Sequence, residues 1–293
     1  MTTTQTPTAE QTPQHAPIIR RLPDLRTLTR NWQRAGDVIG VVPTMGALHP
    51  GHLSLVQAAQ AQCDRVIVTI FVNPKQFNNP DDLAHYPRTE TDDAQKLSAY
   101  AVDAIWAPDP DQVYPDGFAT KVTVDGLTDV LCGAERPGHF DGVATVVTKL
   151  FLQTGAHRAF FGEKDYQQLQ VVTRLARDLD VDITVVPCPT VRDPDGLAMS
   201  SRNLRLGPAD RAAAVALPRT MQTMAQALRT GTPPDTARKT ATGTLVSAGF
   251  DTVEYLDLRD GATLSLLDAP APNARLFAAA WIGGVRLIDN IAL

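Results

Sequence analysis

The segment VIGVVPTMGALHPGH occupies residues 38–52 and joins a strand signal to a glycine-containing turn and the start of a helix. Its first five residues are apolar and mostly β-branched, which is typical of a buried strand. After the turn, the positions that fall on one face of a helix are Leu55, Ala58, Ala59 and Cys63. The segment therefore predicts a strand, a tight turn and a helix in succession, with Cys63 as a core thiol.

The same alternation of strand and helix signals continues to about residue 190. Further strands are expected at residues 65–72, 104–106, 158–161 and 183–186, with helices at 89–100 and 141–154. A last helix is expected to bury Leu169, Val172, Ala176 and Leu179. Strands that alternate with helices form parallel βαβ units with right-handed crossovers. We therefore predict an α/β fold, with a Rossmann-like parallel sheet over residues 19–190.

The two ends of the chain differ from this pattern. Residues 1–18 are dominated by Thr, Gln and Pro, so we expect a disordered tail there. Residues 191–293 predict a smaller α+β domain, hinged at a polar loop over residues 192–203. Within it we expect strands at 253–258 and 275–281, and a helix over 208–230 that Pro218 kinks or divides.

Composition narrows the possible partners and compartment. The 293 residues carry 27 basic and 32 acidic side chains, a net charge of −5 that argues against general nucleic-acid or anionic-membrane binding. No apolar run has the length that a membrane span needs. Three widely spaced cysteines without a CxxC pair fit reduced thiols in a cytoplasmic protein better than disulfides or a zinc site.

The turn at residues 42–52 is the densest group of polar residues in this pattern. Ligands of open α/β sheets bind at the carboxyl ends of strands, and a helix N-terminus favours phosphate there. Gly46 and Gly51 permit close backbone approach, while His49 and His52 can meet anionic oxygens. Two alternatives remain open: the histidines could form a metal-binding pair, or they could be ordinary polar loop residues.

Three further clusters could carry chemistry, each with a plainer alternative. FGEKDYQQL at residues 161–169 places Lys164 at a strand end, although its charges could be ordinary helix-start residues. MSSRN at 199–203 offers two hydroxyls and an arginine to negative oxygens, or simply a helix cap. FVNPKQF at 71–77 could bind hydroxyls or a carboxylate through the amides of Asn73 and Gln76, or it could simply form a turn. Together these groups suit the positioning of phosphates better than glycoside or acyl hydrolysis.

With these motifs in order, the chain resembles the pantoate–β-alanine ligase family, whose signature turn belongs to the HIGH-type nucleotidylyltransferases. The segments that carry the resemblance are PTMGALHPGH, IFVNPKQF, HYPRT, GHFDGV, FGEKDYQQL and DGLAMSSRN, with a weaker echo in RLIDNI near the C-terminus. The resemblance implies that pantoate attacks the α-phosphorus of ATP to give pantoyl adenylate and pyrophosphate. β-Alanine would then displace AMP to give pantothenate.

The resemblance also implies roles for individual residues. Those expected to act in catalysis are His49, His52, Lys164, Ser200, Ser201 and Arg202. The ATP site would comprise Met45, Gly46, Ala47, Leu48, His49, Pro50, Gly51, His52, Gly162, Glu163, Lys164, Asp165, Val191, Met199, Ser200, Ser201 and Arg202. Gln76 and Gln168 would bind pantoate, with Gln76 also near β-alanine. Asp92 and Asp93 would lie beside Mg²⁺, and Asn73, Tyr86 and Arg136 would support the site. A homodimer is implied as well.

Two other functions remain possible at this point. A related adenylyltransferase acting on a phosphorylated acceptor should present extra Arg or Lys to that phosphate, where this chain has Gln76 and Gln168. A non-catalytic nucleotide sensor would be expected to lack some of the charged phosphate contacts that this chain retains.

Overall fold

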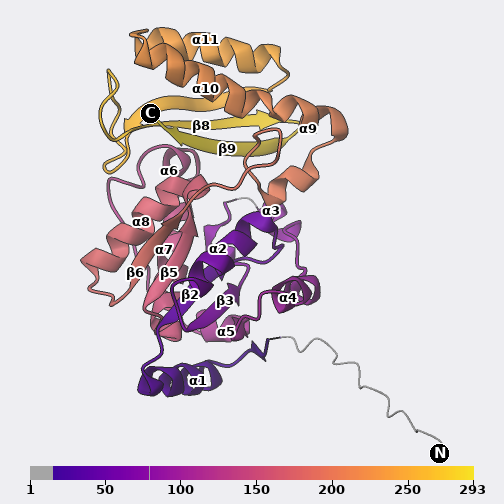
Figure 1. The fold of residues 1–293 in the computed structure, drawn as a ribbon, viewed down its shortest axis with the longest axis vertical. Coiled ribbons are helices and arrows are strands. Elements are labelled where there is room, and N and C mark those ends of the chain that lie inside the picture. The colour runs from indigo at the N-terminus through magenta and orange to yellow at the C-terminus, as the bar shows by residue number, and fades with distance from the viewer. Residues whose placement is uncertain (1–15, 79) are drawn as a thin grey trace, which may run out of the picture.

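The computed structural model describes residues 16–78 and 80–293, and its larger part is built on a parallel sheet (Figure 1). The strands lie in the order β1-β4-β3-β2-β5-β6, and every paired strand in this sheet is parallel. They are β1 (Ile18–Ile19), β2 (Ile39–Thr44), β3 (Arg65–Ile70), β4 (Ala104–Trp106), β5 (Arg158–Gly162) and β6 (Thr184–Cys188). This confirms the predicted α/β fold with a Rossmann-like sheet.

The centre of the sheet is β2, where the strand order reverses. β2 pairs with β3 on one side, Thr44 lying opposite Ile70, and with β5 on the other. Such a reversal opens a crevice at the carboxyl ends of the strands, which is where open sheets bind ligands. The strand also packs closely against the loop before β3, because a Cβ atom at Gly40 would lie 2.8 Å from Cys63 Sγ.

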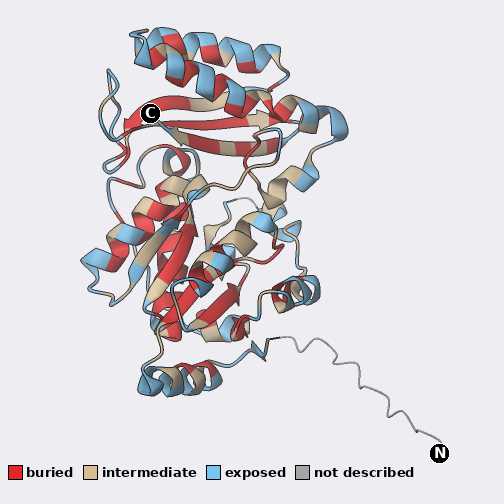
Figure 2. Ribbon diagram, viewed as in Figure 1, coloured by how far each residue is buried: buried red, intermediate tan, exposed pale blue. Residues whose placement is uncertain are grey.

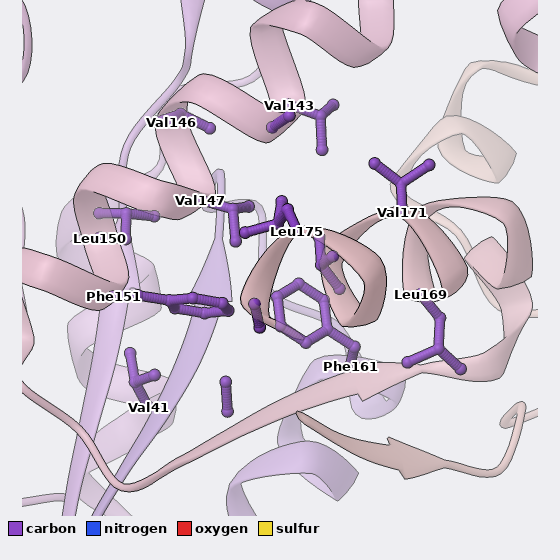
Figure 3. Packing of buried hydrophobic residues seen from close by; sticks show 14 of the residues in the cluster. Val41, Val143, Val146, Val147, Leu150, Phe151, Phe161, Leu169, Val171 and Leu175 are labelled. Atoms are coloured by element: carbon purple, nitrogen blue, oxygen red, sulfur yellow. The ribbon is translucent and has the colours of Figure 1, made fainter. Parts of the chain in front are cut away.

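Helices cover both faces of this sheet. One face packs against α1 (Leu22–Ala35), α7 (His139–Thr154) and α8 (Tyr166–Asp178), and the other against α2 (Pro50–Gln60) and α4 (Glu90–Ser98). The predicted apolar stripe of α7 faces the core, as Figure 3 shows for Val143, Val147 and Phe151, and the strands between the layers are largely buried (Figure 2). Leu179 was expected in the core but is 50% exposed, because α8 ends one residue before it.

The C-terminal part is a three-stranded antiparallel sheet of β7 (Thr252–Asp260), β8 (Ala274–Ile282) and β9 (Val285–Ala292). Helices α10 (Ala216–Arg229) and α11 (Pro234–Ser247) pack on one face, and Figure 1 shows the other face turned toward the large domain. Alternate residues of all three strands enter a separate core with these helices. We call this unit the small domain.

The helix expected over residues 208–230 is divided, but earlier than Pro218. It forms α9 (Pro208–Ala214) and α10, and the break falls at Val215. A proline lacks the N–H that would bond the carbonyl four residues earlier, so Pro218 leaves Ala214 without its helical partner. Proline is tolerated where it lies, in the first turn of α10, because N–H groups there have no intrahelical acceptor.

Shorter elements connect these units. They are α3 (Pro80–Ala84), α5 (Pro110–Val113), α6 (Cys132–Glu135) and the 3₁₀ helices η1 (Pro74–Gln76), η2 (Glu163–Asp165) and η3 (Ser201–Arg205). Residues 1–15 of the expected tail lie outside the described residues, whereas Ile18, also assigned to that tail, pairs with Ile105 in the sheet. Among the described helices, none is long and apolar enough to cross a membrane.

Candidate active site

The turn between β2 and α2 is closed by its two histidines. His49 is the N-cap of α2, and its Nδ1 accepts the Gly51 N–H at 3.1 Å. The His49 backbone N–H in turn points to His52 Nδ1 at 3.4 Å, which completes a capping box. The ring centroids of the two histidines are 4.1 Å apart. Both rings are thus fixed by the start of the helix that follows them.

Burial and neighbouring charges keep both rings neutral, and the capping contacts decide which ring nitrogen carries the proton. Burial, followed by the charge of Lys164, lowers the pKa of His49 to about 4. Burial and the neighbouring His49 lower the pKa of His52 to about 3. Both imidazoles are therefore neutral at pH 7, and because each Nδ1 accepts a hydrogen bond, each proton resides on Nε2. Each ring can donate one hydrogen bond to an anionic oxygen without carrying a charge.

Asp93 holds the backbone of the same turn. It is fully buried, and its carboxylate accepts the N–H groups of Ala47 and Leu48, each at 2.8 Å. Thr89 Oγ1 donates to the same carboxylate at 3.0 Å. Gly46 precedes these residues with a φ of +83°, a conformation that glycine adopts without strain. A carboxylate with these partners shapes the turn, and its burial does not fit the expected role of Asp93 beside Mg²⁺.

A cavity of about 230 Å³ opens beside this turn, at the carboxyl ends of β2, β3 and β5. The expected site residues that line it are Met45, His49, Gly51, His52, Gln76, Gly162, Lys164, Asp165, Gln168, Val191, Met199, Ser200, Ser201 and Arg202. Asn73, Tyr86 and Arg136 line it as well. An adjoining cavity of about 410 Å³ extends between the two domains and shares Lys164, Gln168 and Arg202. The structure therefore gathers motifs that are more than 150 residues apart in the sequence.

Other expected residues lie near the cavity without lining it. Gly46, Ala47 and Leu48 are buried behind the turn, Pro50 is exposed, and the Glu163 carboxylate lies 3.7 Å from Arg275. Asp92 is exposed on α4 and, like Asp93, lines neither of these two cavities. The turn therefore contributes mainly Met45, Gly51 and its two histidines to the cavity.

The cationic side of the cavity combines Lys164 with the MSSRN loop. Lys164 lies in η2, directly after β5, and its Nζ is 3.6 Å from Asp165. Ser200 caps η3 by accepting the Arg202 N–H at 3.2 Å. The Arg202 guanidinium lies 3.6 Å from Asp82 of α3. Both cations thus have carboxylate neighbours near the cavity, and among the described residues neither forms a bidentate pair.

The amide side of the cavity is an ordered chain of hydrogen bonds. Tyr114 OH donates to Asn73 Oδ1 at 2.7 Å, and Asn73 Nδ2 donates to Gln76 Oε1 at 3.0 Å. Asn73 Nδ2 also donates to the Gly142 carbonyl at 3.0 Å. Because Gln76 Oε1 is an acceptor in this chain, its Nε2 is left as the donor, and it faces Met45 Sδ at 3.1 Å. Gln76 therefore presents N–H groups to the cavity.

His139 is a residue of the cavity for which the sequence suggested no role. It is 8% exposed, and its Nδ1 lies 2.7 Å from the Gln76 carbonyl, while Arg136 Nη1 lies 3.3 Å from its Nε2. Burial and the Arg136 charge lower its pKa to about 3, so the ring is neutral and donates through Nδ1. Its position in the segment GHFDGV is the signal that could have identified it.

The carboxylates of the site show whether the residues present could hold the expected magnesium ion. Across the described residues, no three His, Cys, Asp or Glu side chains gather in a group that could hold a metal. Asp165 is the carboxylate that lines the cavity beside the turn. Mg²⁺ usually keeps several waters and binds through phosphates with one or two carboxylates. A single lining carboxylate could hold only an ion carried in with a triphosphate, and the buried Asp93 and the exposed Asp92 do not fit a resident ion.

Known proteins match this chain over nearly its whole length. The profile of the Pantoate-beta-alanine ligase family matches residues 17–292. The chain belongs to the pantoate-beta-alanine ligase family. Among its members, the pantothenate synthetases of Roseobacter denitrificans and Ruegeria pomeroyi are each 64% identical to this chain. Those alignments cover 94% and 95% of this chain, and 97% and 98% of the relatives.

Solved structures of the family have the same architecture. Pantothenate synthetase from Thermus thermophilus superposes with a TM-score of 0.88 at 41% identity, covering 94% of this chain and 99% of that one. Pantoate-beta-alanine ligase from Francisella tularensis, complexed with beta-gamma ATP and beta-alanine, gives a TM-score of 0.79 at 36% identity. That comparison covers 94% of this chain and 97% of the other. The family membership therefore extends over both domains.

Proposed function

We propose that this chain ligates pantoate to β-alanine, forming pantothenate through a pantoyl-adenylate intermediate and releasing AMP and pyrophosphate from ATP. The observation that carries the proposal is a single cavity, at the strand-order reversal, lined by two groups of residues. One group can neutralise phosphate: His49, His52, Lys164, Ser200, Ser201 and Arg202. The other offers the neutral amides of Gln76 and Gln168. Membership in the family supports the same reaction.

The first step requires the approach of two anions. Pantoate is ionised at pH 7, so its carboxylate attacks the α-phosphorus without a general base. The barrier lies in repulsion between this carboxylate and the triphosphate, and in alignment of the attacking and leaving oxygens. Neutral Nε2–H donors at His49 and His52 can hold phosphate oxygens, while Lys164 and Arg202 supply positive charge. Mg²⁺ bound to the triphosphate would neutralise further charge, and Asp165, which lines the cavity, could help to hold it.

Neutral donors also suit the nucleophile. Gln76 presents N–H groups because Asn73 fixes its amide, so it can bind the hydroxyls or carboxylate of pantoate without forming an ion pair. An ion pair would lower the reactivity of the attacking oxygen by stabilising its charge in the ground state. A phosphorylated acceptor would be expected to need a cation here instead. The amide pair therefore favours pantoate over such an acceptor.

In the second step, the β-alanine amine attacks the adenylate carbonyl and AMP leaves. The mixed anhydride is reactive toward water, and the cavity between the domains offers a partly enclosed place for it. We further propose that the chain acts as a homodimer in the cytoplasm.

The decisive experiment is to measure pyrophosphate release by the purified chain. We expect release only when both ATP and pantoate are present, followed by AMP and pantothenate after β-alanine is added. Release with a phosphorylated acceptor but not with pantoate would replace this function with adenylyl transfer to that acceptor. ATP binding without release under any condition would indicate a nucleotide sensor.

A further inference from the structure

Two consecutive residues of β9 hold segments that line the cavity: Asn290 contacts the turn that carries Lys164, and Asp289 contacts the start of the loop that carries Arg202. Asp289 and Asn290 are 3% and 4% exposed. Asn290 Nδ2 donates to the main-chain carbonyls of Glu163 at 2.8 Å and Lys164 at 2.9 Å. Arg275 Nη1 donates to Asn290 Oδ1, which fixes the orientation of the amide. The backbone of the lysine turn is therefore held by a side chain from the other domain.

Asp289, the neighbouring residue, holds the start of the loop that leads to MSSRN. Both of its carboxylate oxygens pair with the Arg192 guanidinium, at 2.6 and 2.8 Å. Arg192 begins the loop that leads to Met199 and Arg202, and it also donates to the Gly196 carbonyl within that loop. A bidentate pair of this kind fixes orientation as well as distance. The Asp289 carboxylate also accepts the Asn290 N–H at 2.8 Å, so the two anchors are joined directly.

We propose that Asp289 and Asn290 are positioning residues that set the spacing between Lys164 and the MSSRN loop around the triphosphate. This inference rests on the proposed function, in which those segments bind ATP. Lysine is a point charge on a flexible stem, so its location depends on where its backbone is held. Asn290 fixes that backbone at two carbonyls, while Asp289 fixes the start of the loop that carries Arg202. The small domain thus acts on the reaction through one strand of its sheet.

The informative substitution is Asn290→Asp, which keeps the shape of the side chain and its pairing with Arg275. It places a carboxylate oxygen against the Glu163 and Lys164 carbonyls in place of two N–H donors, so the turn should shift. We expect the KM for ATP to rise about tenfold and pantoate-dependent pyrophosphate release to slow about tenfold. The KM for β-alanine, measured on preformed adenylate, should change less than about twofold.

The matched control is Asp257→Asn, on β7 of the same sheet. Asp257 is 9% exposed and pairs with Arg259 at 2.7 Å, so the substitution perturbs a buried ion pair within the small domain. We expect it to lower the melting temperature while leaving the KM for ATP unchanged. If Asn290→Asp lowers the melting temperature in the same way and leaves ATP binding and adenylation untouched, Asn290 is only a structural contact and the inference is wrong.

A double-mutant cycle with Lys164→Ala tests whether Asn290 acts through the lysine. In the Lys164→Ala background, Asn290→Asp should change the KM for ATP less than about twofold, because the group that it positions is missing. A full tenfold effect in both backgrounds would contradict the proposal. If Asn290→Asp does not fold, Asp289→Asn serves in its place, with a weaker ATP affinity expected and an unchanged affinity contradicting the proposal.

The Kd for ATP, measured by calorimetry without pantoate, separates this inference from the proposed function. Wild-type protein that binds ATP but releases no pyrophosphate with pantoate would refute the proposed function alone. Equal Kd values for wild type and Asn290→Asp would refute the positioning role alone.

Discussion

The two sides of the cavity are built in different ways. On the side of the β2–α2 turn, the polar groups have defined partners: the two histidines are held by the cap of α2, and the buried Asp93 carboxylate holds Ala47 and Leu48. On the side of the MSSRN loop, the charged groups are more exposed, and Arg202 and Asp82 retain 31% and 26% exposure. Buried hydrogen bonds fix geometry, whereas exposed ion pairs contribute little and respond to salt. Substitutions beside the β2–α2 turn should therefore displace the groups that bind phosphate, whereas substitutions beside the MSSRN loop should change only the charge that the phosphates meet.

The largest effect is expected from His52→Ala. Loss of one positioned donor should reduce the adenylation rate by ~10²-fold or more, in the range observed when a single donor to a developing charge is removed. Pyrophosphate release measures the rate, and circular dichroism checks that the fold is intact. His52→Gln keeps an N–H donor and should recover part of the loss. If the rate of His52→Ala stays within about threefold of wild type, the side of the β2–α2 turn does not hold the phosphates.

Asp93→Asn should have the next largest effect, because it weakens the anchor of the turn. The hydrogen bonds of a charged acceptor contribute about 1.5–3 kcal/mol, so we expect a lower melting temperature and an adenylation rate reduced about tenfold. The Mg²⁺ concentration that gives half-maximal rate should stay unchanged. Asp92→Asn, at the exposed neighbouring position, is the control and should behave as wild type. A raised Mg²⁺ requirement in both variants would restore these residues as magnesium ligands.

Acid should destabilise the protein through two histidines whose pKa values are lowered in the folded state. His52 and His139 have pKa values of about 3 in the folded state, against about 6.5 when unfolded. Between these values only the unfolded chain takes up protons, so the free energy of unfolding decreases as pH falls below about 6.5. The two groups together lose about 4 kcal/mol of stability between pH 7 and pH 5, so we expect the melting temperature to be about 10 °C lower at pH 5. His139→Gln should reduce this dependence, and an equal dependence in that variant would exclude His139 as a contributor.

The smallest effect is expected on the charged side, from Asp82→Asn. Asp82 lies near both Arg202 and Arg205, so its neutralisation should release Arg202 toward the phosphates. A half-buried pair separated by 3.6 Å contributes about 1 kcal/mol, so the KM for ATP should fall about fivefold or less at low salt. The difference should fade in high salt. Asp111→Asn removes the same charge at a position that lines neither cavity, and it should leave the KM unchanged. A change in the KM for ATP larger than this, and equal at low and high salt, would mean that the side of the MSSRN loop is also held in one geometry.

The sequence alone determined the strand-turn-helix at residues 38–52 and the alternation that follows it. Buried strands and amphipathic helices leave periodic patterns that are local, so β2, β3, β4, β5 and α7 were predicted close to their observed bounds. α1, α11 and β9 were not predicted. In β9, Asp289 and Asn290 interrupt the apolar pattern because Asp289 pairs with Arg192 of the hinge loop and Asn290 bonds to the turn of Lys164 in the other domain.

Only the tertiary structure decided how these parts cooperate. The family resemblance implied a place for Asp93 beside Mg²⁺, but it could not show that the carboxylate is buried beneath Ala47 and Leu48, 45 or more residues away. Nor could it show that Asn73 orients Gln76, that both histidines are neutral, or that Asn290 holds the turn of Lys164. Hydrogen-bond partners and the burial that shifts a pKa come from residues that are distant in the chain. Periodicity is a local property of the sequence, whereas the electrostatics of the site depend on contacts that only folding creates.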